Sequence, residues 1–151
     1  MIQMKKHTIP EIELKYRPVA KKDRVKVLNS QSAFELFLDN WNMDTIELFE
    51  EFKIVLLNRA NEVIGIHTIS KGGISGTIVD IRLIIAIAIK SASSSIILAH
   101  NHPSGNLKPS ESDIRLHEKI KKATDLMDVQ ILDNLIITID GYYSFADTGF
   151  K

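Results

Sequence analysis

The chain has 151 residues, of which 44% are hydrophobic and 25% are charged, and its formal net charge is zero. These values are typical of one globular domain with its own core, and the balanced charge indicates no particular partner. The chain contains no cysteine, which excludes a disulfide scaffold, a cysteine-based zinc finger, an iron–sulfur site and a thiol nucleophile. Any metal site must therefore be built from histidine and carboxylate side chains.

The start of the chain and its most apolar run argue against export and against insertion into a membrane. The first residues, MIQMKKHTIPEIE, lack the apolar segment that follows the lysines of a signal peptide. The run Ile81–Ile89 is too short to span a bilayer, and it contains Arg82. We therefore expect a cytoplasmic protein with no membrane partner.

Charge is distributed unevenly along the chain. Residues 1–30 carry eight lysines and arginines against three acidic residues, whereas the remainder carries eleven against sixteen. We therefore distinguish a basic N-terminal arm, residues 1–29, from a domain that covers residues 30–151. A basic arm on an acidic body can make a weak contact with DNA, but without interleaved aromatic residues a solvated terminus is the simpler interpretation.

The predicted elements begin with a short alternating stretch, IELKY, at Ile12–Tyr16, which indicates an edge strand. Ser32 and Glu35 have the spacing of a capping box, so a helix is expected over residues 32–42.

A hairpin is predicted next. FKIVLLN, residues 52–58, has the apolar composition of a buried strand, and the alternating residues 62–69 predict its partner strand after a turn at 59–61. The glycine-rich segment Lys71–Thr77, KGGISGT, is then expected to form a loop.

The second half of the chain alternates helices with strands. Asp80 is expected to cap a helix over 81–92, and because that helix is apolar nearly all round it is predicted to be deeply buried. SIILA, residues 95–99, predicts a short buried strand, and Ser110 is expected to open a helix over 111–127. Three closing strands are predicted at residues 129–132, 135–139 and 142–145. The order favours an α/β fold with a mixed β-sheet flanked by helices.

The segment HNHPSGNLKPSESD, His100 to Asp113, contains the side chains that can carry chemistry. His100 and His102 directly follow an apolar strand, and at this spacing two side chains leave an extended chain on the same face. Asp113 lies in the first turn of the next predicted helix and can supply a third ligand. Two histidines, one carboxylate and an open water position make the ligand set of a catalytic zinc, which lowers the pKa of its water to about 7.

Hydrolysis by such a site also requires a base that takes the proton of the water, and a nearby carboxylate is the natural choice. Three candidates precede the first core strand: Glu47, Glu50 and Glu51. Sequence spacing alone does not choose among them.

A purely structural interpretation exists for part of this pattern. Ser110 and Asp113 have the spacing of a capping box, so both side chains can serve only to start a helix. Single histidines are also more often structural than metal-binding. The joint pattern of two histidines and a carboxylate favours a metal site, and capping and coordination can coexist.

The sequence resembles the RadC family and its JAMM (MPN+) or JAB metalloprotease-like domain. HNHPSGNLKPSESD matches the RadC-type form of the JAMM motif, and EEFKIVLLNRANEVIG, KGGISGT and DNLIITIDGYYSF follow the order of the family. The resemblance covers roughly residues 30–147. It implies a JAMM/MPN-like fold with cytidine-deaminase-like architecture.

The resemblance also implies a role for each motif residue. It makes His100, His102 and Asp113 ligands of Zn²⁺, and it makes Glu51 the residue that holds or deprotonates the zinc water. It makes Ser110 the hydroxyl that helps to stabilise an oxyanion.

The chain departs from the family pattern at two positions. Asn134, next to Asp133, stands where the family has a histidine, which puts any role of that histidine in doubt. His117 stands where the family usually has threonine, and we expect it on the helix surface. The 29 residues before the domain are too few for the helix-hairpin-helix region of longer relatives, so the chain is expected to be a short form of the family.

Two main functions remain open at this point. The first is a zinc-dependent hydrolase that cleaves a peptide or isopeptide amide of an unknown protein or peptide substrate. The alternative is an accessory protein of DNA repair or recombination in which the metal is structural, and an interaction module with a vestigial site is a third interpretation. The sequence leaves the substrate and the oligomeric state open.

Overall fold

The computed structural model describes residues 8–73 and 76–150, and in this part of the chain it confirms the predicted α/β class. Five strands form one mixed sheet in the order β2-β1-β3-β4-β5. The β3–β4 pair is parallel and the other three pairs are antiparallel. The elements in chain order are a 3-10 helix η1 (Lys21–Asp23), α1 (Ser30–Asp39), β1 (Glu51–Leu57), β2 (Val63–Lys71), α2 (Ile81–Lys90), β3 (Ser95–Asn101), α3 (Glu111–Asp125), β4 (Gln130–Thr138) and β5 (Gly141–Ser144).

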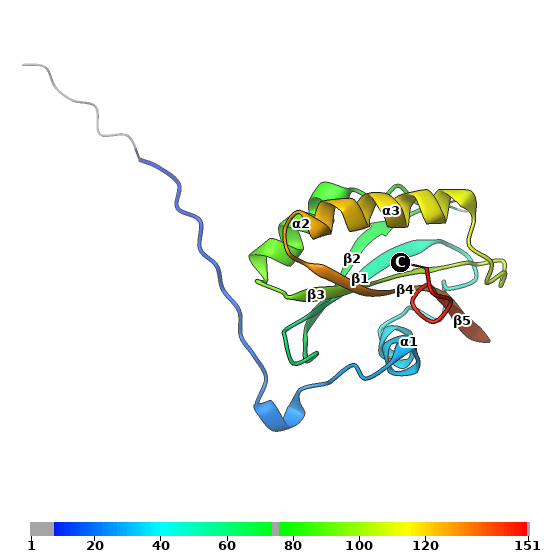
Figure 1. The fold of residues 1–151 in the computed structure, drawn as a ribbon, viewed down its shortest axis with the longest axis horizontal. Helices are drawn as coiled ribbons and strands as arrows, with labels where there is room; N and C mark the ends of the chain where they lie inside the picture. Colours follow the sequence, from blue (N-terminus) through cyan, green and yellow to red (C-terminus); the bar gives the residue numbers. More distant parts are fainter. Residues whose placement is uncertain (1–7, 74–75, 151) are drawn as a thin grey trace, which may run out of the picture.

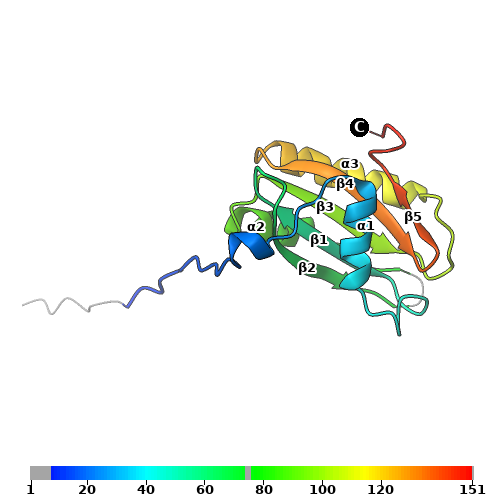
Figure 2. The ribbon, with the colours of Figure 1, turned by 90° about the horizontal axis from the view of Figure 1, so that it is seen from below.

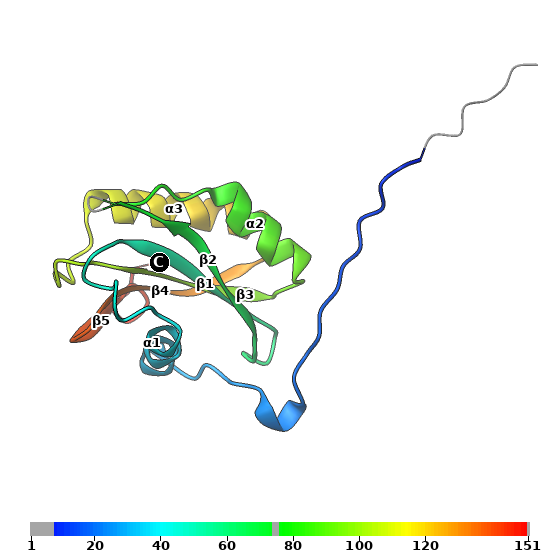
Figure 3. The same ribbon diagram turned by 180° about the vertical axis from the view of Figure 1, so that it is seen from behind.

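Helices cover both faces of the sheet. Helices α2 and α3 lie on one face and α1 lies on the other (Figure 1), and the same layers are seen from behind in Figure 3. All residues of β1 and β3 are buried. Alternate side chains of these strands enter two separate cores: Val55 and Ile97 pack with the α1 face, whereas Ile54 and Leu98 pack with the α2–α3 face.

Helix α1 begins two residues earlier than predicted. Its N-cap is Asn29, whose side chain accepts a hydrogen bond from the Ser32 backbone N–H at 2.9 Å, and the Ser32 hydroxyl accepts one from the Asn29 N–H at 3.0 Å. Ser32 is therefore the third helical residue of a capping box and not the cap. Figure 2 shows α1 crossing the sheet.

The prediction that helix α2 is deeply buried is wrong. Only Ile84 and Ala88 of its residues are buried, and Ile89 is 50% exposed. The helix lies at the surface and packs on the sheet through one narrow apolar stripe. No helix of the described residues is long and apolar enough to cross a membrane.

Strand boundaries also differ from the prediction. The two strands expected at 129–132 and 135–139 are one continuous strand, β4, because the polar pair Asp133 and Asn134 is accommodated inside it by side-chain hydrogen bonds. Strand β3 extends to Asn101 and so includes the first histidine of the motif.

The basic arm is described only from residue 8, and its first seven residues lie outside the described residues. The edge strand predicted at Ile12–Tyr16 does not form. Residues 8–20 have no regular secondary structure, and Figure 1 shows them extending away from the domain.

Candidate metal centre

The two motif histidines leave the end of β3 on the same face of the sheet, toward α3. His100 is paired with Phe52 of β1 and Ile136 of β4, so its backbone is fixed from both sides. The chain stays attached to β4 beyond the strand end, because the His102 backbone N–H donates to the Ile137 carbonyl at 3.1 Å. The alternation of an extended chain therefore carries through both histidines, as the sequence predicted.

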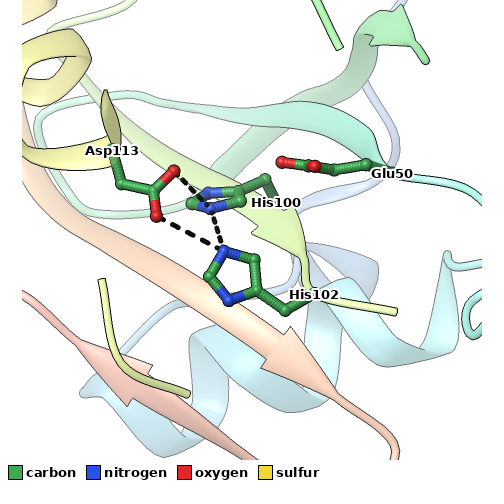
Figure 4. Close-up of side chains that lie close together, drawn as sticks. All are labelled: Glu50, His100, His102 and Asp113. Carbon is green, nitrogen blue, oxygen red and sulfur yellow. Dashed lines mark hydrogen bonds and ion pairs between the residues drawn. The ribbon is translucent and has the colours of Figure 1, made fainter. Parts of the chain in front are cut away.

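The side chains of His100, His102 and Asp113 converge (Figure 4). The two imidazole Nε2 atoms lie 3.0 Å apart. The Asp113 Oδ1 atom lies 3.2 Å from His100 Nε2, and its Oδ2 atom lies 3.4 Å from His102 Nε2. The three side chains therefore form one compact group of donor atoms.

These separations are close to the spacing of ligand atoms around one metal ion, with each oxygen of Asp113 near one of the two imidazoles. Ligand bonds of about 2.0–2.1 Å, as zinc forms with nitrogen and oxygen, give ligand-to-ligand distances of roughly 3.3 Å. Glu50 completes the group, and one ligand atom from each of the four residues lies within 4.8 Å of the others. Glu50 therefore lies beside the three closely spaced side chains.

Each imidazole is held in a defined orientation. The His102 Nδ1 atom lies 2.6 Å from the Asn106 carbonyl oxygen, so Nδ1 carries the proton and Nε2 presents its lone pair to the group. The His100 ring stacks on Phe52 with centroids 6.1 Å apart and planes 6° from parallel. Both rings are thus orientated before any metal binds.

A capping box at the start of α3 positions the carboxylate. The Asp113 Oδ2 atom accepts a hydrogen bond from the Ser110 backbone N–H at 2.7 Å, and the Ser110 hydroxyl accepts one from the Asp113 N–H at 3.1 Å. The hydroxyl proton of Ser110 is not needed for this box. Capping and ligand roles therefore coexist in these two residues.

The charges of the group are coupled. Burial on its own would raise the pKa of Asp113, but hydrogen bonds from His100 and His102 hold that pKa far below its usual range. Burial alone would lower the pKa of His102, but its contacts with Asp113 and Asn106 and the charges of Asp113 and Glu50 together raise that pKa. An ionised carboxylate beside two imidazoles favours a cation at this point.

The glutamate beside the histidines is Glu50, which was one of the three candidates, and not Glu51. Strand alternation sends Glu51 to the α1 face of the sheet, whereas Glu50 lies on the face of Phe52 and His100. The structure therefore does not bring the predicted catalytic Glu51 to the ligand group.

The Glu51 side chain lies instead in a buried cluster of charges. Its carboxylate lies 3.5 Å from the Lys53 Nζ atom and 3.4 Å from the Lys71 Nζ atom. The Lys53 ammonium donates to the Thr68 hydroxyl at 2.9 Å and lies 5.0 Å from the ring centre of Trp41. The two lysines balance the buried charge of Glu51, which gives this residue a structural role, and its Oε2 atom has an ion pair but no hydrogen bond.

Asn101, between the two histidines, anchors the segment that carries Glu50. Its side chain is fully buried on the face opposite the histidines. Its Oδ1 atom accepts from the Glu51 N–H at 2.7 Å, and its Nδ2 group donates to the carbonyls of Ile46 and Phe49 at 2.6 and 2.7 Å. These three hydrogen bonds hold the backbone between Ile46 and Glu51 against the end of β3.

The glycine-rich loop packs against the same segment. The Gly72 N–H donates to the Glu50 carbonyl at 2.8 Å. A Cβ atom at Gly72 would lie 2.0 Å from the Gly76 carbonyl oxygen, so only glycine permits this close approach. Ile74 and Ser75 of the predicted loop lie outside the described residues.

A cavity of about 620 Å³ opens over the ligand group. Its lining includes the four residues of the group together with Ser110, Thr77 and Lys108. Ser110 therefore faces the same space as the ligands and can reach a molecule bound there. The volume suits a segment of polypeptide or a small molecule.

His117, expected at the surface, is buried. It is 5% exposed, its Nδ1 atom lies 3.1 Å from the Asn134 Nδ2 group, and its ring stacks on Phe145 at 4.8 Å. Burial lowers the pKa of His117, and nearby Lys121 acts in the same direction. Because His117 lies one helical turn after Asp113, this contact ties the ligand-bearing helix to β4.

The fold and the ligand group together define an α/β domain with a candidate metal centre at the end of its central strands. A family model described as a RadC-like JAB domain matches residues 27–150. The chain belongs to this family, which confirms the resemblance deduced from the motif.

Similar proteins support the same family. A UPF0758 protein of Flavobacterium johnsoniae is 51% identical over 100 residues, which is 66% of this chain and 44% of that protein. A UPF0758 protein of Porphyromonas gingivalis is 48% identical over 101 residues, again 66% of this chain and 44% of the relative. One from Clostridium botulinum is 34% identical over 143 residues, which is 94% of this chain and 61% of the relative. The chain thus matches less than two thirds of the length of each of these relatives.

Proposed function

We propose that this chain is a zinc-dependent hydrolase of the JAMM type that cleaves a peptide or isopeptide amide. The observation that carries the proposal is the group of His100, His102, Asp113 and Glu50 at the floor of a cavity. Two imidazole nitrogens and the Asp113 carboxylate at 3.0 to 3.4 Å, beside the second carboxylate of Glu50, match a catalytic zinc site better than a closed structural one.

The first three residues would hold the metal through Nε2 of both imidazoles and the carboxylate of Asp113. When bound, zinc supplies a Lewis acid that polarises a carbonyl and acidifies water near neutral pH. Glu50 would accept the proton of that water and pass it to the leaving amine. Ser110 retains a free hydroxyl proton and lines the cavity, so it is the donor proposed for the developing oxyanion.

An amide is the preferred substrate class because one metal ion and one base are sufficient for the attack of water on an amide carbonyl. Phosphodiester cleavage more often uses two metals about 3.5–4 Å apart that hold both the attacking and the leaving oxygen. The ligand group of the described residues has donors for one ion. The accessory function in DNA repair stays a prediction, and salt-dependent DNA binding by the full chain would test it.

The first experiment measures zinc by elemental analysis in the wild type and in His102→Ala after reconstitution at neutral pH. We expect about one zinc per chain in the wild type and none in the variant. Stoichiometric zinc in His102→Ala would contradict the proposed ligand set.

The second experiment uses two adjacent glutamates as a matched pair. Fluorogenic peptide and isopeptide libraries are screened with the wild type, and Glu50→Gln and Glu51→Gln are then compared on any substrate that is cleaved. Glu50→Gln should keep its zinc and lose at least about 100-fold in rate, because the general base is removed. Glu51→Gln should stay within a few-fold of the wild type. Equal rates for the two variants would reject Glu50 as the base.

A further inference from the structure

The N-terminal arm contains a segment with the sequence pattern of a strand that pairs with no strand among the described residues. Residues 11–17, EIELKYR, lie between Pro10 and Pro18. Their apolar side chains alternate with charged ones, and Ile12, Leu14 and Tyr16 are 89%, 71% and 57% exposed. Period-two alternation is the pattern of a strand with one covered face, yet these residues belong to no strand or bridge of the structure.

The sheet offers this segment an open edge. Strand β2 is an edge strand of the sheet, because β1 pairs with one side of it and no other strand of the described residues pairs with the other side. On the outer side, pairing begins but stops at once: Lys26 forms an isolated antiparallel bridge with Glu62, and the Val63 N–H donates to the Val25 carbonyl at 2.8 Å. The 3-10 helix η1 then turns the chain away from the sheet (Figures 1 and 2).

An uninterrupted continuation of this pairing would put the chain's own arm in the wrong register. If the pairing of Lys26 with Glu62 continued without interruption, Arg17 would lie opposite Lys71, the last residue of β2. The apolar residues before Arg17 would then run past the end of the strand. A second copy of the chain is free of this restriction, because its arm approaches the edge independently of that bridge.

The arm and the edge also fit each other chemically. Seven residues between two prolines match an added strand that stops at both ends, because proline has no N–H to donate to a ladder. Once paired, the prolines and the outward-facing charges would block further strand addition. A Cβ atom built on Gly65 of β2 would have no neighbouring atom within 4 Å. This open space leaves room for a large side chain from an incoming strand.

We propose that residues 11–17 of one copy add as a strand to the outer edge of β2 in a second copy, and that reciprocal exchange forms a homodimer. The exchange buries the apolar stripe of each arm, and it satisfies backbone groups of each β2 edge. Two-fold symmetry repeats the same contact between an arm and a β2 edge, so one closed dimer contains this contact twice. The interface uses neither the ligand group nor the proposed hydrolysis, and it is tested separately from them.

The test measures the mass of the full chain by analytical ultracentrifugation over a wide concentration range. The wild type should dimerise, and Leu14→Ser should weaken the dimer at least tenfold. The matched control is Lys15→Ser, which shortens the adjacent side chain on the charged face and should leave dimerisation unchanged. Both substitutions lie in the exposed arm, outside the core, so neither should disturb folding.

Hydrogen exchange of the β2 amides identifies the surface. In the wild-type dimer, outward-facing amides of β2 should be protected, and Leu14→Ser should remove that protection. A monomeric wild type at every concentration would overturn the proposal, as would an equal effect of the two substitutions. Protection of β2 in a monomer, lost in Leu14→Ser, would show that the arm folds onto its own chain and would also overturn the second copy as partner.

Discussion

Where β1 begins and β3 ends, both faces of the sheet carry polar residues, but these residues make different kinds of contact. On the α3 face, His100, His102 and Glu50 gather around a space that suits a cation. On the α1 face, Asn101 and Glu51 come from the positions next to them in the chain, yet they bind backbone groups and lysines. Strand alternation separates them, so each strand end supplies chemistry to one face and support to the other.

This comparison predicts that contacts on the α1 face can be removed without displacing the ligands on the α3 face. In Asn101→Ala, the carbonyls of Ile46 and Phe49 and the Glu51 N–H lose their partner, so the segment that carries Glu50 is released. We expect hydrolysis to fall by about 10- to 100-fold, as for other residues that orientate a metal site. Zinc stoichiometry should be unchanged, because all three ligands remain.

The measurement compares the pH profile of hydrolysis and the zinc content of Asn101→Ala with those of the wild type. A changed acidic limb, which reports the base, would distinguish loss of Glu50 positioning from a general loss of folded protein. Thermal unfolding provides the control for folding. A folded variant with the wild-type rate and pH profile would reject the positioning role.

The buried charges on the same face give a second prediction, which concerns stability. In Glu51→Ala, the Lys53 ammonium remains buried with Thr68 and the Trp41 ring but without its carboxylate. We expect the free energy of unfolding to fall by about 3 kcal/mol, as when one partner of a buried ion pair is removed. Urea denaturation measures this change.

The adjacent substitution, Glu50→Ala, is the control for this prediction. Glu50 has no lysine partner in the described structure, so its removal should cost little stability while it abolishes hydrolysis. The contrast would disappear if both variants lost stability equally. In that case the division between a chemical face and a supporting face would not hold.

The same alternation explains what the sequence could and could not predict. His100 and His102 were found because their spacing keeps them on one face wherever the strand begins. The choice between Glu50 and Glu51 depended on the face toward which an even-numbered residue points, and a shift of one residue reverses that answer. Glu50 points to the same face as Phe52 and the other even-numbered apolar residues of the strand. That pattern selects Glu50 only when the same face is known to carry His100, which requires the pairing of the two strands.

Features that depend on contacts distant in the sequence were predicted less well. The pair Asp133 and Asn134 suggested a break in β4, because its hydrogen-bond partners on α3 and β5 are invisible to local reasoning. For the same reason His117 was expected at the surface, and α2 was expected to be buried. The fold class was predicted correctly because it depends on the order of elements and not on the environment of single residues.

The smallest expected effect concerns His117, which lies one helical turn after Asp113 and packs α3 against β4. Burial lowers its pKa in the folded protein, whereas in the unfolded chain it lies near 6.5. As pH falls through 6.5, the unfolded chain therefore takes up a proton that the folded protein resists, and stability is lost down to the folded pKa. Above 6.5 both states are neutral and this contribution is fully present.

We expect the free energy of unfolding of the metal-free wild type to fall between pH 7.5 and 5.5 more steeply than that of His117→Gln. The difference in slope cannot exceed about 1.4 kcal/mol per pH unit, the limit for one proton. Because the two proteins differ only at residue 117, contributions from all other residues cancel in the comparison. Parallel pH profiles would show that His117 is not held neutral by burial and would remove it as a pH-sensitive contact between α3 and β4.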